Sequence, residues 1–241
     1  IIARVGVGLD NVDQEAAKTK NIRVINAVEG AMNAVAELVL GLMLSLARQT
    51  ARGDRAIRNE QWLKKELKGT ELRGKYLGII GLGNIGKRLG RLAHALNMNI
   101  IGYDVVPIDE EFSKEVGLMK ADLNTLLQSS DYVSIHVPLL DSTYHLLDAQ
   151  KMSTMKKTAK IINTSRGGVV DEDALYDAIK SGTLGGAALD VFEKEPAIGT
   201  KLAELDNVIL TPHIGAQTKE AQSLAANVIA EKIVQILRGV I

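Results

Sequence analysis

The stretch Tyr76-Leu-Gly-Ile-Ile-Gly-Leu-Gly-Asn-Ile-Gly86 predicts a buried strand, a tight turn and the start of a helix. Its glycines follow the spacing G-x-G-x-x-G. In such a unit the first glycine permits the turn, the second lets a pyrophosphate approach the backbone, and the third lets the helix pack closely on the strand. The first turn of the helix would direct N–H groups and a positive dipole end at a phosphate. The stretch therefore favours dinucleotide binding by Gly81, Gly83, Asn84, Ile85 and Gly86.

A glycine triplet alone also occurs in ordinary turns, so the interpretation depends on the residues after it. A helical pattern over 85–96 leads to a second apolar run over 99–103, which ends at Asp104. An acid about 20 residues beyond the first glycine accepts hydrogen bonds from the adenosine ribose hydroxyls. Its charge would repel a 2′-phosphate, and residues 105–113 contain no Arg or Lys to neutralise one. The sequence therefore favours NAD over NADP.

Composition narrows the function classes. The 241 residues are 46% hydrophobic but only 3% aromatic, which predicts an aliphatic core. The 29 Lys and Arg balance the 29 Asp and Glu, without a basic stripe, so we expect no nucleic-acid partner. The absence of cysteine is consistent with a reducing cytoplasm, and the four histidines show no metal-ligand spacing, so no metal is expected.

The first 75 residues predict a helix over 13–20, a strand over 22–26 and a helix over 34–50 with Asn33 as its N-cap. The apolar run 34–47 within that last helix is interrupted by Glu37 and is too short to span a bilayer. We therefore expect a buried or subunit-contact helix and no membrane. The charged residues 52–73 predict a mobile or partner-wrapping arm. Together with the apolar helix, this arm predicts a homodimer.

From residue 76 onward, strands and helices alternate. This alternation predicts an α/β fold of the Rossmann type, with a doubly wound parallel sheet and helices on both faces. The expected strands are 76–81, 99–103, 132–137, 160–164, 186–191 and 208–211, and the expected helices are 85–96, 122–129, 148–155, 171–181 and 218–238.

Polar side chains follow three of the predicted strands. Arg166 follows the strand 160–164, Glu193 and Glu195 follow 186–191, and His213 follows 208–211. Ligands of open parallel sheets bind beyond the carboxyl ends of the strands, where these loops would meet.

These residue types suit the oxidation of an alcohol beside a carboxylate. A histidine can accept the hydroxyl proton near neutral pH, and a carboxylate can orient it. An arginine can bind a carboxylate through two parallel hydrogen bonds. Each of these residues could instead have only a structural role. The residues alone leave Glu193 and Glu195 as alternatives for the carboxylate beside the histidine. His136 ends a strand and could line the cofactor cleft, whereas His94 and His145 are interpreted as structural or surface residues.

The chain resembles the D-isomer-specific 2-hydroxyacid dehydrogenase family, most closely the members that act on 3-phosphoglycerate. The matching segments occur in the family's order over nearly the whole chain. They are Arg4-Val-Gly-Val-Gly-Leu-Asp-Asn-Val-Asp13, Ala36-Glu-Leu38, Gly81-Leu-Gly-Asn-Ile-Gly86, His136-Val-Pro-Leu139, Asn163-Thr-Ser-Arg-Gly-Gly-Val-Val-Asp171, Ala188-Leu-Asp-Val-Phe-Glu-Lys-Glu-Pro196 and Thr211-Pro-His-Ile-Gly-Ala216.

The resemblance implies a role for individual residues. It implies His213 as the acid/base, Glu195 as its carboxylate partner and Arg166 as the ligand of the substrate carboxylate. In the NAD site it implies Asp104 at the ribose, Asp190 at the nicotinamide carboxamide and Pro138 beside the cofactor. Arg4 and Asn33 fall where the family has substrate-proximal residues.

The resemblance also implies a domain organisation and a reaction. Residues 1–28 would be a remnant of a flavodoxin-like substrate domain, 29–213 the NAD-binding domain, and 214–241 a helix that returns to the substrate domain. The implied reaction is oxidation of 3-phosphoglycerate to 3-phosphohydroxypyruvate in serine biosynthesis, although a fragment of this kind could be inactive. The alternatives are a glyoxylate/hydroxypyruvate reductase, a D-lactate-type dehydrogenase, or a non-catalytic NAD-sensing protein like the family's corepressors.

Overall fold

The computed structural model describes residues 1–6, 8, 9, 11–28 and 30–239; Val7, Asp10 and Glu29, which fall in or near the predicted N-terminal elements, lie outside them. The chain divides into two compact units. The sheet unit is Ala36–His213, and the terminal unit combines Ile1–Val35 with Ile214–Ile241. The boundary after Val35 falls within a helix, seven residues after the one that the resemblance implies, and the boundary after His213 is at the implied position.

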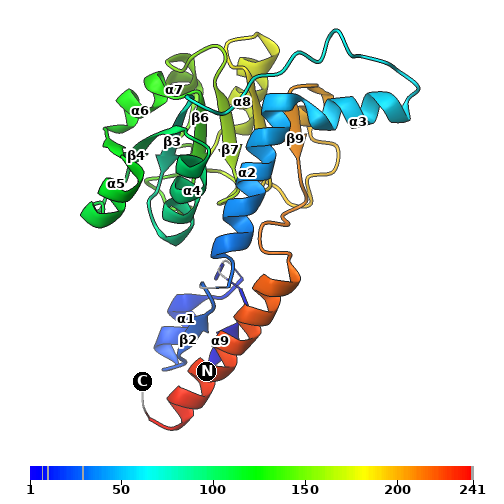
Figure 1. Cartoon of the computed structure of the whole chain (residues 1–241). Helices are drawn as coiled ribbons and strands as arrows, with labels where there is room; N and C mark the ends of the chain where they lie inside the picture. Colours follow the sequence, from blue (N-terminus) through cyan, green and yellow to red (C-terminus); the bar gives the residue numbers. More distant parts are fainter. Residues whose placement is uncertain (7, 10, 29, 240–241) are drawn as a thin grey trace. The chain divides into compact units, whose positions relative to one another are not determined.

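The sheet unit, all of which is described, contains a seven-stranded parallel sheet in the order β5-β4-β3-β6-β7-β8-β9 (Figure 1). The chain enters at β3, the third strand from one edge, proceeds to β4 and β5, and then returns to β6 on the other side of β3. The strands are β3 (Tyr76–Ile80), β4 (Asn99–Tyr103), β5 (Met119–Lys120), β6 (Tyr132–Ile135), β7 (Lys160–Asn163), β8 (Gly186–Leu189) and β9 (Val208–Leu210). This order confirms the doubly wound fold and places a topological switch point between β3 and β6, where ligands of such sheets bind.

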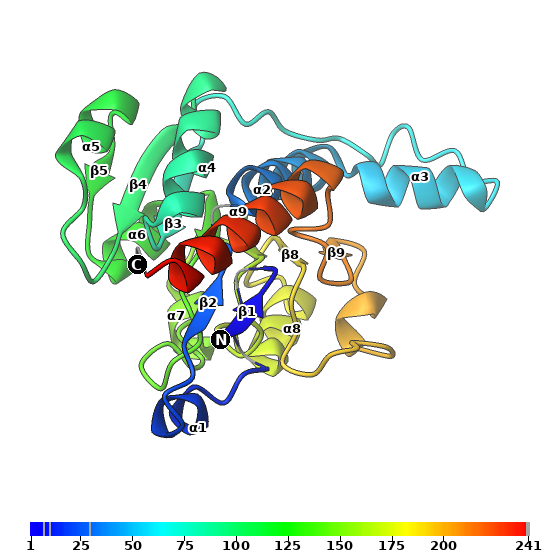
Figure 2. The same ribbon diagram turned by 90° about the horizontal axis from the view of Figure 1, so that it is seen from below.

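Helices cover both faces of this sheet. Figures 1 and 2 show α2 and α4 on one face and α6, α7 and α8 on the other. Consecutive residues of β3 illustrate the alternation: Gly78 packs against Leu126 of α6, whereas Ile79 packs against Gly90 of α4. The helices are α2 (Met32–Arg48), α3 (Thr50–Arg58), α4 (Asn84–Ala95), α5 (Glu110–Val116), α6 (Leu123–Ser129), α7 (Ala149–Ser153) and α8 (Glu172–Lys180), followed by the short 3-10 helix η1 (Lys201–Glu204).

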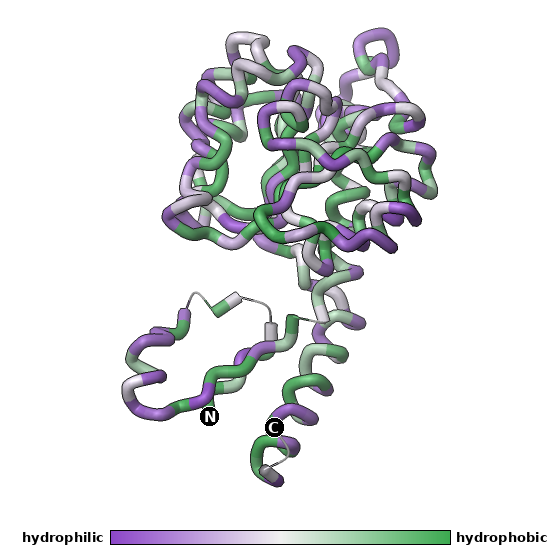
Figure 3. Tube along the Cα trace, turned by 90° about the vertical axis from the view of Figure 1, so that its left-hand side faces the viewer, coloured by the Kyte–Doolittle hydropathy of each residue, from purple (hydrophilic) through white to green (hydrophobic). Residues whose placement is uncertain are grey.

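The core of the sheet unit is aliphatic, as the composition predicts. Val133, Ile135, Ile161 and Leu175 are fully buried, and Figure 3 shows apolar stretches running through the middle of this unit. Because parallel strands are buried on both faces, they carry nearly continuous apolar runs rather than alternating ones.

The segment before β3 differs from the prediction in two places. Helix α2 begins at Met32, and the Val35 N–H already donates to the Ala31 carbonyl, so Asn33 lies inside the helix and is not its N-cap. The predicted arm begins with helix α3, which ends at Arg58 and pairs that residue with Asp54 one turn earlier. The first part of the predicted arm 52–73 is therefore helical, and its contact with a partner stays a prediction.

No single helix among the described residues is long and apolar enough to cross a membrane. Helices α2 and α3, which meet at a bend of 66°, reach the length and composition of a span only when taken together.

The terminal unit is smaller. Strand β1 (Ile2–Arg4) pairs in parallel with β2 (Val24–Asn26), and helix α1 (Gln14–Thr19) connects them. Helix α9 (Lys219–Leu237) packs on these strands, and its Lys232 ammonium donates to the Asn26 carbonyl. Asp13 caps α1 and Thr218 caps α9, each by accepting a backbone N–H of the first turn.

Candidate active site

The glycine turn after β3 has the geometry that a dinucleotide needs. Gly81 has a φ of +90°, and a β-carbon there would lie 2.6 Å from the His136 carbonyl oxygen at the end of β6. A β-carbon on Gly86 would overlap the Gly81 carbonyl oxygen, so α4 packs tightly against the turn. A β-carbon on Gly83 would meet nothing within 4 Å, and Gly83 is also the N-cap of α4. Two of the three glycines are thus required by close packing, and the third faces open space at a helix N-terminus, as a pyrophosphate requires.

Asp104 lies against this turn. One oxygen of its carboxylate accepts the Leu82 N–H at 2.7 Å, and the other accepts the Val106 N–H at 3.2 Å. These bonds hold the acid at the end of β4, next to β3. A cavity of about 480 Å³ borders Asp104 and includes Val106, Pro107 and Ile108. The residues present therefore fit the adenosine half of NAD, and the contact of Asp104 with the ribose stays a prediction.

His136 follows β6 at the switch point. Its Nε2 shares a hydrogen bond of 2.9 Å with the Ser134 hydroxyl, and burial lowers the pKa of its imidazole to about 4. His136 is therefore neutral near pH 7 and lies beside the glycine turn as a polar, uncharged group. Pro138, two residues on, is exposed at the same strand end, and its carbonyl accepts the Thr143 hydroxyl at 2.6 Å.

The loops after β8 and β9 bring an imidazole and a carboxylate together. His213 Nδ1 lies 2.9 Å from Glu195 Oε2, and the other Glu195 oxygen accepts the Phe192 N–H at 3.2 Å. Both side chains are accessible, His213 at 53% and Glu195 at 39%. An ionised Glu195 places the imidazole proton on Nδ1, so Nε2 is the nitrogen that can accept a proton. Both residues line a cavity of about 650 Å³ together with Pro196, Leu210 and Pro212.

Arg166 lies on the loop after β7, the neighbour of β8. Its guanidinium donates to the Ser165 carbonyl at 2.7 Å, and its own carbonyl accepts the Asn163 amide at 2.9 Å. A β-carbon on Gly167 would overlap the Phe192 carbonyl oxygen, so the arginine loop touches the loop that carries Glu195. The three loops therefore lie at one edge of the sheet, and a direct bond joins His213 and Glu195.

Asp190 ties these loops together from inside. It is fully buried; its N–H donates to the Asn163 carbonyl at 2.9 Å, and its carboxylate accepts the Thr211 hydroxyl at 2.6 Å. The bonds link the end of β8 to the ends of both neighbouring strands. Sequence reasoning selected Asp190 only through the resemblance, and it missed the supporting Asn163 and Thr211. The available signal was a polar residue at the end of each apolar strand or directly after it.

The remaining predicted residues lie elsewhere. Glu193, the alternative to Glu195, is bonded to His145 and not to His213. Arg4 and Asn33 belong to the terminal unit, and their proximity to substrate stays a prediction from the resemblance. Among the described residues, the only group of His, Asp and Glu side chains close enough to hold a metal is His145, Asp171 and Glu193.

Comparison with known proteins gives consistent matches. Residues 40–215 match the family described as D-isomer specific 2-hydroxyacid dehydrogenase, NAD binding domain. The chain is 47% identical to a D-3-phosphoglycerate dehydrogenase of Methanocaldococcus jannaschii, over 99% of this chain and 46% of that protein. It is also 47% identical to a hydroxypyruvate reductase of Thermotoga maritima, over 97% of this chain and 76% of that protein.

Solved structures of related dehydrogenases are also similar to this chain. A D-lactate dehydrogenase from Aquifex aeolicus, complexed with NAD and lactic acid, superposes with a TM-score of 0.89 at 33% identity, over 99% of this chain and 76% of that one. The chain spans about half the length of the D-3-phosphoglycerate dehydrogenase that it matches.

Proposed function

The chain belongs to the D-isomer-specific 2-hydroxyacid dehydrogenases, and from that premise we propose that it transfers a hydride between a D-2-hydroxy acid and NAD. The observation that carries the proposal is the His213–Glu195 pair, 2.9 Å apart, at the carboxyl edge of a sheet whose switch point carries the nucleotide turn. The pair provides a proton acceptor, and the turn provides a place for the cofactor.

Within this proposal, His213 moves the proton. When bound, NAD supplies the carbon that exchanges hydride with the substrate. His213 Nε2 accepts the hydroxyl proton during oxidation and returns it during reduction. Glu195 keeps the proton of the other ring nitrogen in place and stabilises the imidazolium that forms, since a carboxylate within hydrogen-bond distance favours the charged ring.

Arg166 and Asp190 provide the orientation. We assign the Arg166 guanidinium to the substrate carboxylate, because its planar donors match two carboxylate oxygens. We assign Asp190 to the nicotinamide end of the cofactor, where its bond to Thr211 holds the carboxylate in one orientation. The short contact between Gly167 and Phe192 sets how far the Arg166 loop lies from the Glu195 loop.

For the substrate we propose 3-phosphoglycerate, oxidised to 3-phosphohydroxypyruvate as in serine biosynthesis. The support is the high identity to proteins named D-3-phosphoglycerate dehydrogenase. Hydroxypyruvate reduction is the second candidate, because an equally identical relative carries that name. Rates of the full-length protein on 3-phosphoglycerate and on unphosphorylated glycerate, each with NAD, distinguish the two.

The chemistry is tested by His213→Ala. We expect turnover to fall by at least ~10²-fold, the usual contribution of a general base, while NAD affinity is retained. The matched control is His94→Ala, since His94 is an exposed residue at the end of α4. Near-normal turnover of His213→Ala would eliminate the proposed role.

The cofactor preference is tested separately. We expect Asp104→Ala to narrow the preference for NAD over NADP, because it removes the charge that repels a 2′-phosphate. Unchanged binding of both cofactors would contradict the assignment of Asp104.

We further propose that the protein is a homodimer in a reducing compartment such as the cytoplasm. The support is exposed apolar surface at the start of the sheet unit, where Leu44, Ile57 and Trp62 are 43%, 56% and 78% exposed. Sedimentation analysis that finds a monomer at high concentration would overturn the dimer.

A further inference from the structure

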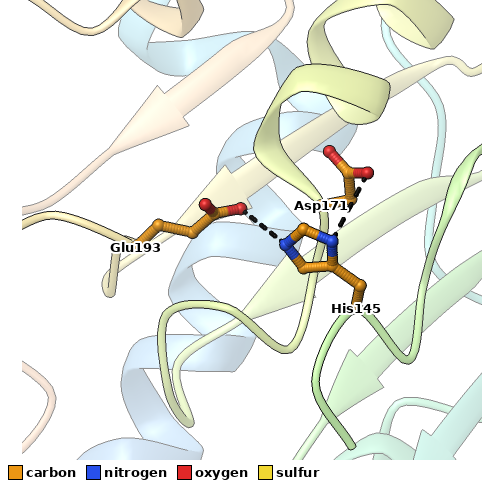
Figure 4. Close-up of side chains that lie close together, drawn as sticks. All are labelled: His145, Asp171 and Glu193. Atoms are coloured by element: carbon orange, nitrogen blue, oxygen red, sulfur yellow. Dashed lines mark hydrogen bonds and ion pairs between the residues drawn. The ribbon is translucent and has the colours of Figure 1, made fainter.

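His145 occupies an unusual position outside the proposed catalytic set. It lies in the loop between β6 and α7, with its ring between two carboxylates from other loops (Figure 4). Its Nε2 is 3.1 Å from Glu193 Oε1, and its Nδ1 is 3.6 Å from Asp171 Oδ2. Each ring nitrogen thus faces a different acid.

This geometry fits pairing of the ring with two separate acids better than a shared metal ion. A single metal could bind only one ring nitrogen, whereas here the two acids lie on opposite sides of the ring. Nε2 is within hydrogen-bond distance of Glu193, whereas the 3.6 Å between Nδ1 and Asp171 is an ion-pair distance. The ring adjoins an acidic cluster, because Glu172 also exchanges hydrogen bonds with Glu193: each backbone N–H donates to the other's carboxylate, at 3.1 and 2.6 Å.

The other acids of this cluster act on Glu172. Burial, and then the charges of Glu193, Asp173 and Glu195, raise the pKa of the Glu172 carboxyl. Removing the His145 ring would take away the partner that lies between Glu193 and Asp171.

The backbone at His145 also indicates a specific role. Its φ of 47° lies in the left-handed region, where glycine and asparagine are the least costly residues. The ring stacks on Tyr144, with centroids 4.0 Å apart and planes within 14°. The contacts of the ring act against the cost of this backbone conformation.

The contacts of His145 reach both loops of the proposed catalytic set. Its N–H donates to the Gly168 carbonyl at 2.7 Å, two residues after Arg166. Its ring bonds Glu193, two residues before Glu195. Gly167 and Phe192, the residues just before these two contacts of His145, approach each other closely.

We propose that His145 is a positioning residue that holds the Arg166 loop and the Glu195 loop in register. This inference rests on the proposed dehydrogenase function. His145 acts through Glu193 and Gly168, and it touches neither substrate nor cofactor. Loss of its ring lets the Glu195 loop shift, which misplaces the imidazole of His213.

The experiment compares His145→Asn with His94→Asn in the full-length protein. Asparagine tolerates the left-handed backbone but cannot reach both carboxylates. We expect kcat to fall about tenfold for His145→Asn, since displacements of about 1 Å at a site cost this much or more. The KM for NAD stays unchanged, because the glycine turn and Asp104 are untouched. Adding Glu193→Gln restores part of kcat, since it removes one unneutralised charge and keeps an acceptor oxygen.

Hydrogen exchange measured by mass spectrometry gives an independent result. Segments 166–171 and 190–196 should exchange faster in His145→Asn, and 76–90 should not. Equal kcat in the two histidine variants, or a parallel loss of kcat and NAD binding without rescue, overturns the proposal. If the wild-type protein turns over no hydroxy acid, the proposed function fails. The positioning role is then judged by hydrogen exchange alone, and unchanged exchange of 166–171 and 190–196 in His145→Asn overturns it.

Discussion

The sheet unit and the terminal unit differ in the size of their sheets and in how many apolar side chains they bury. The sheet unit has a parallel sheet covered on both faces and one large aliphatic core that includes Ile80, Val133, Ile161 and Leu189. The terminal unit has a two-stranded sheet, and among its described residues Ala27, Ala225 and Ile229 form a small buried cluster. Helix α9 leaves Leu224, Val234 and Leu237 exposed at 45%, 44% and 75%.

This difference bears on where chemistry can be located. A catalytic geometry requires side chains that close packing holds in place, and two-stranded sheets have little stability of their own. Every predicted catalytic and cofactor-binding residue lies in the sheet unit. We therefore expect substitutions to be costly in the sheet unit and mild in the terminal unit.

The largest effect is expected at the glycine turn. Gly86→Ala forces a methyl group onto the Gly81 carbonyl, so the free energy of unfolding should fall by about 3 kcal/mol, as for severe overpacking, and NAD binding should be lost. Gly83→Ala is the matched control, because its methyl group meets no atom within 4 Å. It should leave stability unchanged and weaken NAD binding alone. Urea unfolding and NAD titration measure the two effects. Equal losses of stability in the two variants would contradict the conclusion that Gly86 is closely packed and Gly83 is not.

A second prediction concerns His136. Its pKa of about 4 in the folded state lies below the ordinary value of 6.5, so the unfolded chain binds more protons between these values. The contribution of His136 to the free energy of unfolding is therefore fully present above pH 6.5. It is lost as the pH drops from 6.5 to 4, and the loss reaches about 3 kcal/mol. His136→Gln should flatten this part of the curve of unfolding free energy against pH. An identical slope in the variant would show that other groups cause the loss.

A third, smaller effect is expected beside Asp190. Thr211→Val removes the hydroxyl that donates to the buried carboxylate, at similar side-chain volume. The free energy of unfolding should fall by about 1–3 kcal/mol, the cost of a lost hydrogen bond to a charged group. Thr211→Ser keeps the donor and should remain closer to wild type. A valine variant as stable as wild type would mean that Asp190 has enough other partners.

The fold of the sheet unit was predictable from sequence because its signals are local and strong. The apolar runs 76–80 and 99–103 become β3 and β4 with nearly the predicted ends, since parallel strands carry nearly continuous apolar residues. Strand β5 and helix α5 were missed. They contain two and seven residues, and their definition depends on tertiary contacts such as Phe112 packing against Gly90.

The candidate site was predictable only in part. Strand ends identified Arg166 and His213, but the residues could not choose between Glu193 and Glu195, because both follow the same strand. The distinction depends on how the loop folds, which directs Glu195 to His213 and Glu193 to His145. His145 was interpreted as structural or surface because no sequence pattern reveals two carboxylates that arrive from distant loops.

The smallest effect is expected on α9 of the terminal unit, and it separates two reasons why this unit exposes apolar side chains. If Leu224 faces solvent, Leu224→Gln should change the free energy of unfolding by no more than about 0.5 kcal/mol, as for ordinary surface substitutions. Ala225→Gln, one position on, should instead loosen the helix, because Ala225 is buried against Gly30, whose added β-carbon would lie 2.9 Å from its own. Hydrogen exchange over 219–237 measures both variants. The contrary outcome is a Leu224 variant that loses stability like the Ala225 variant, and loses more at high protein concentration. It would mean that a second chain covers this face of α9, and the terminal unit would then be packed as closely as the sheet unit.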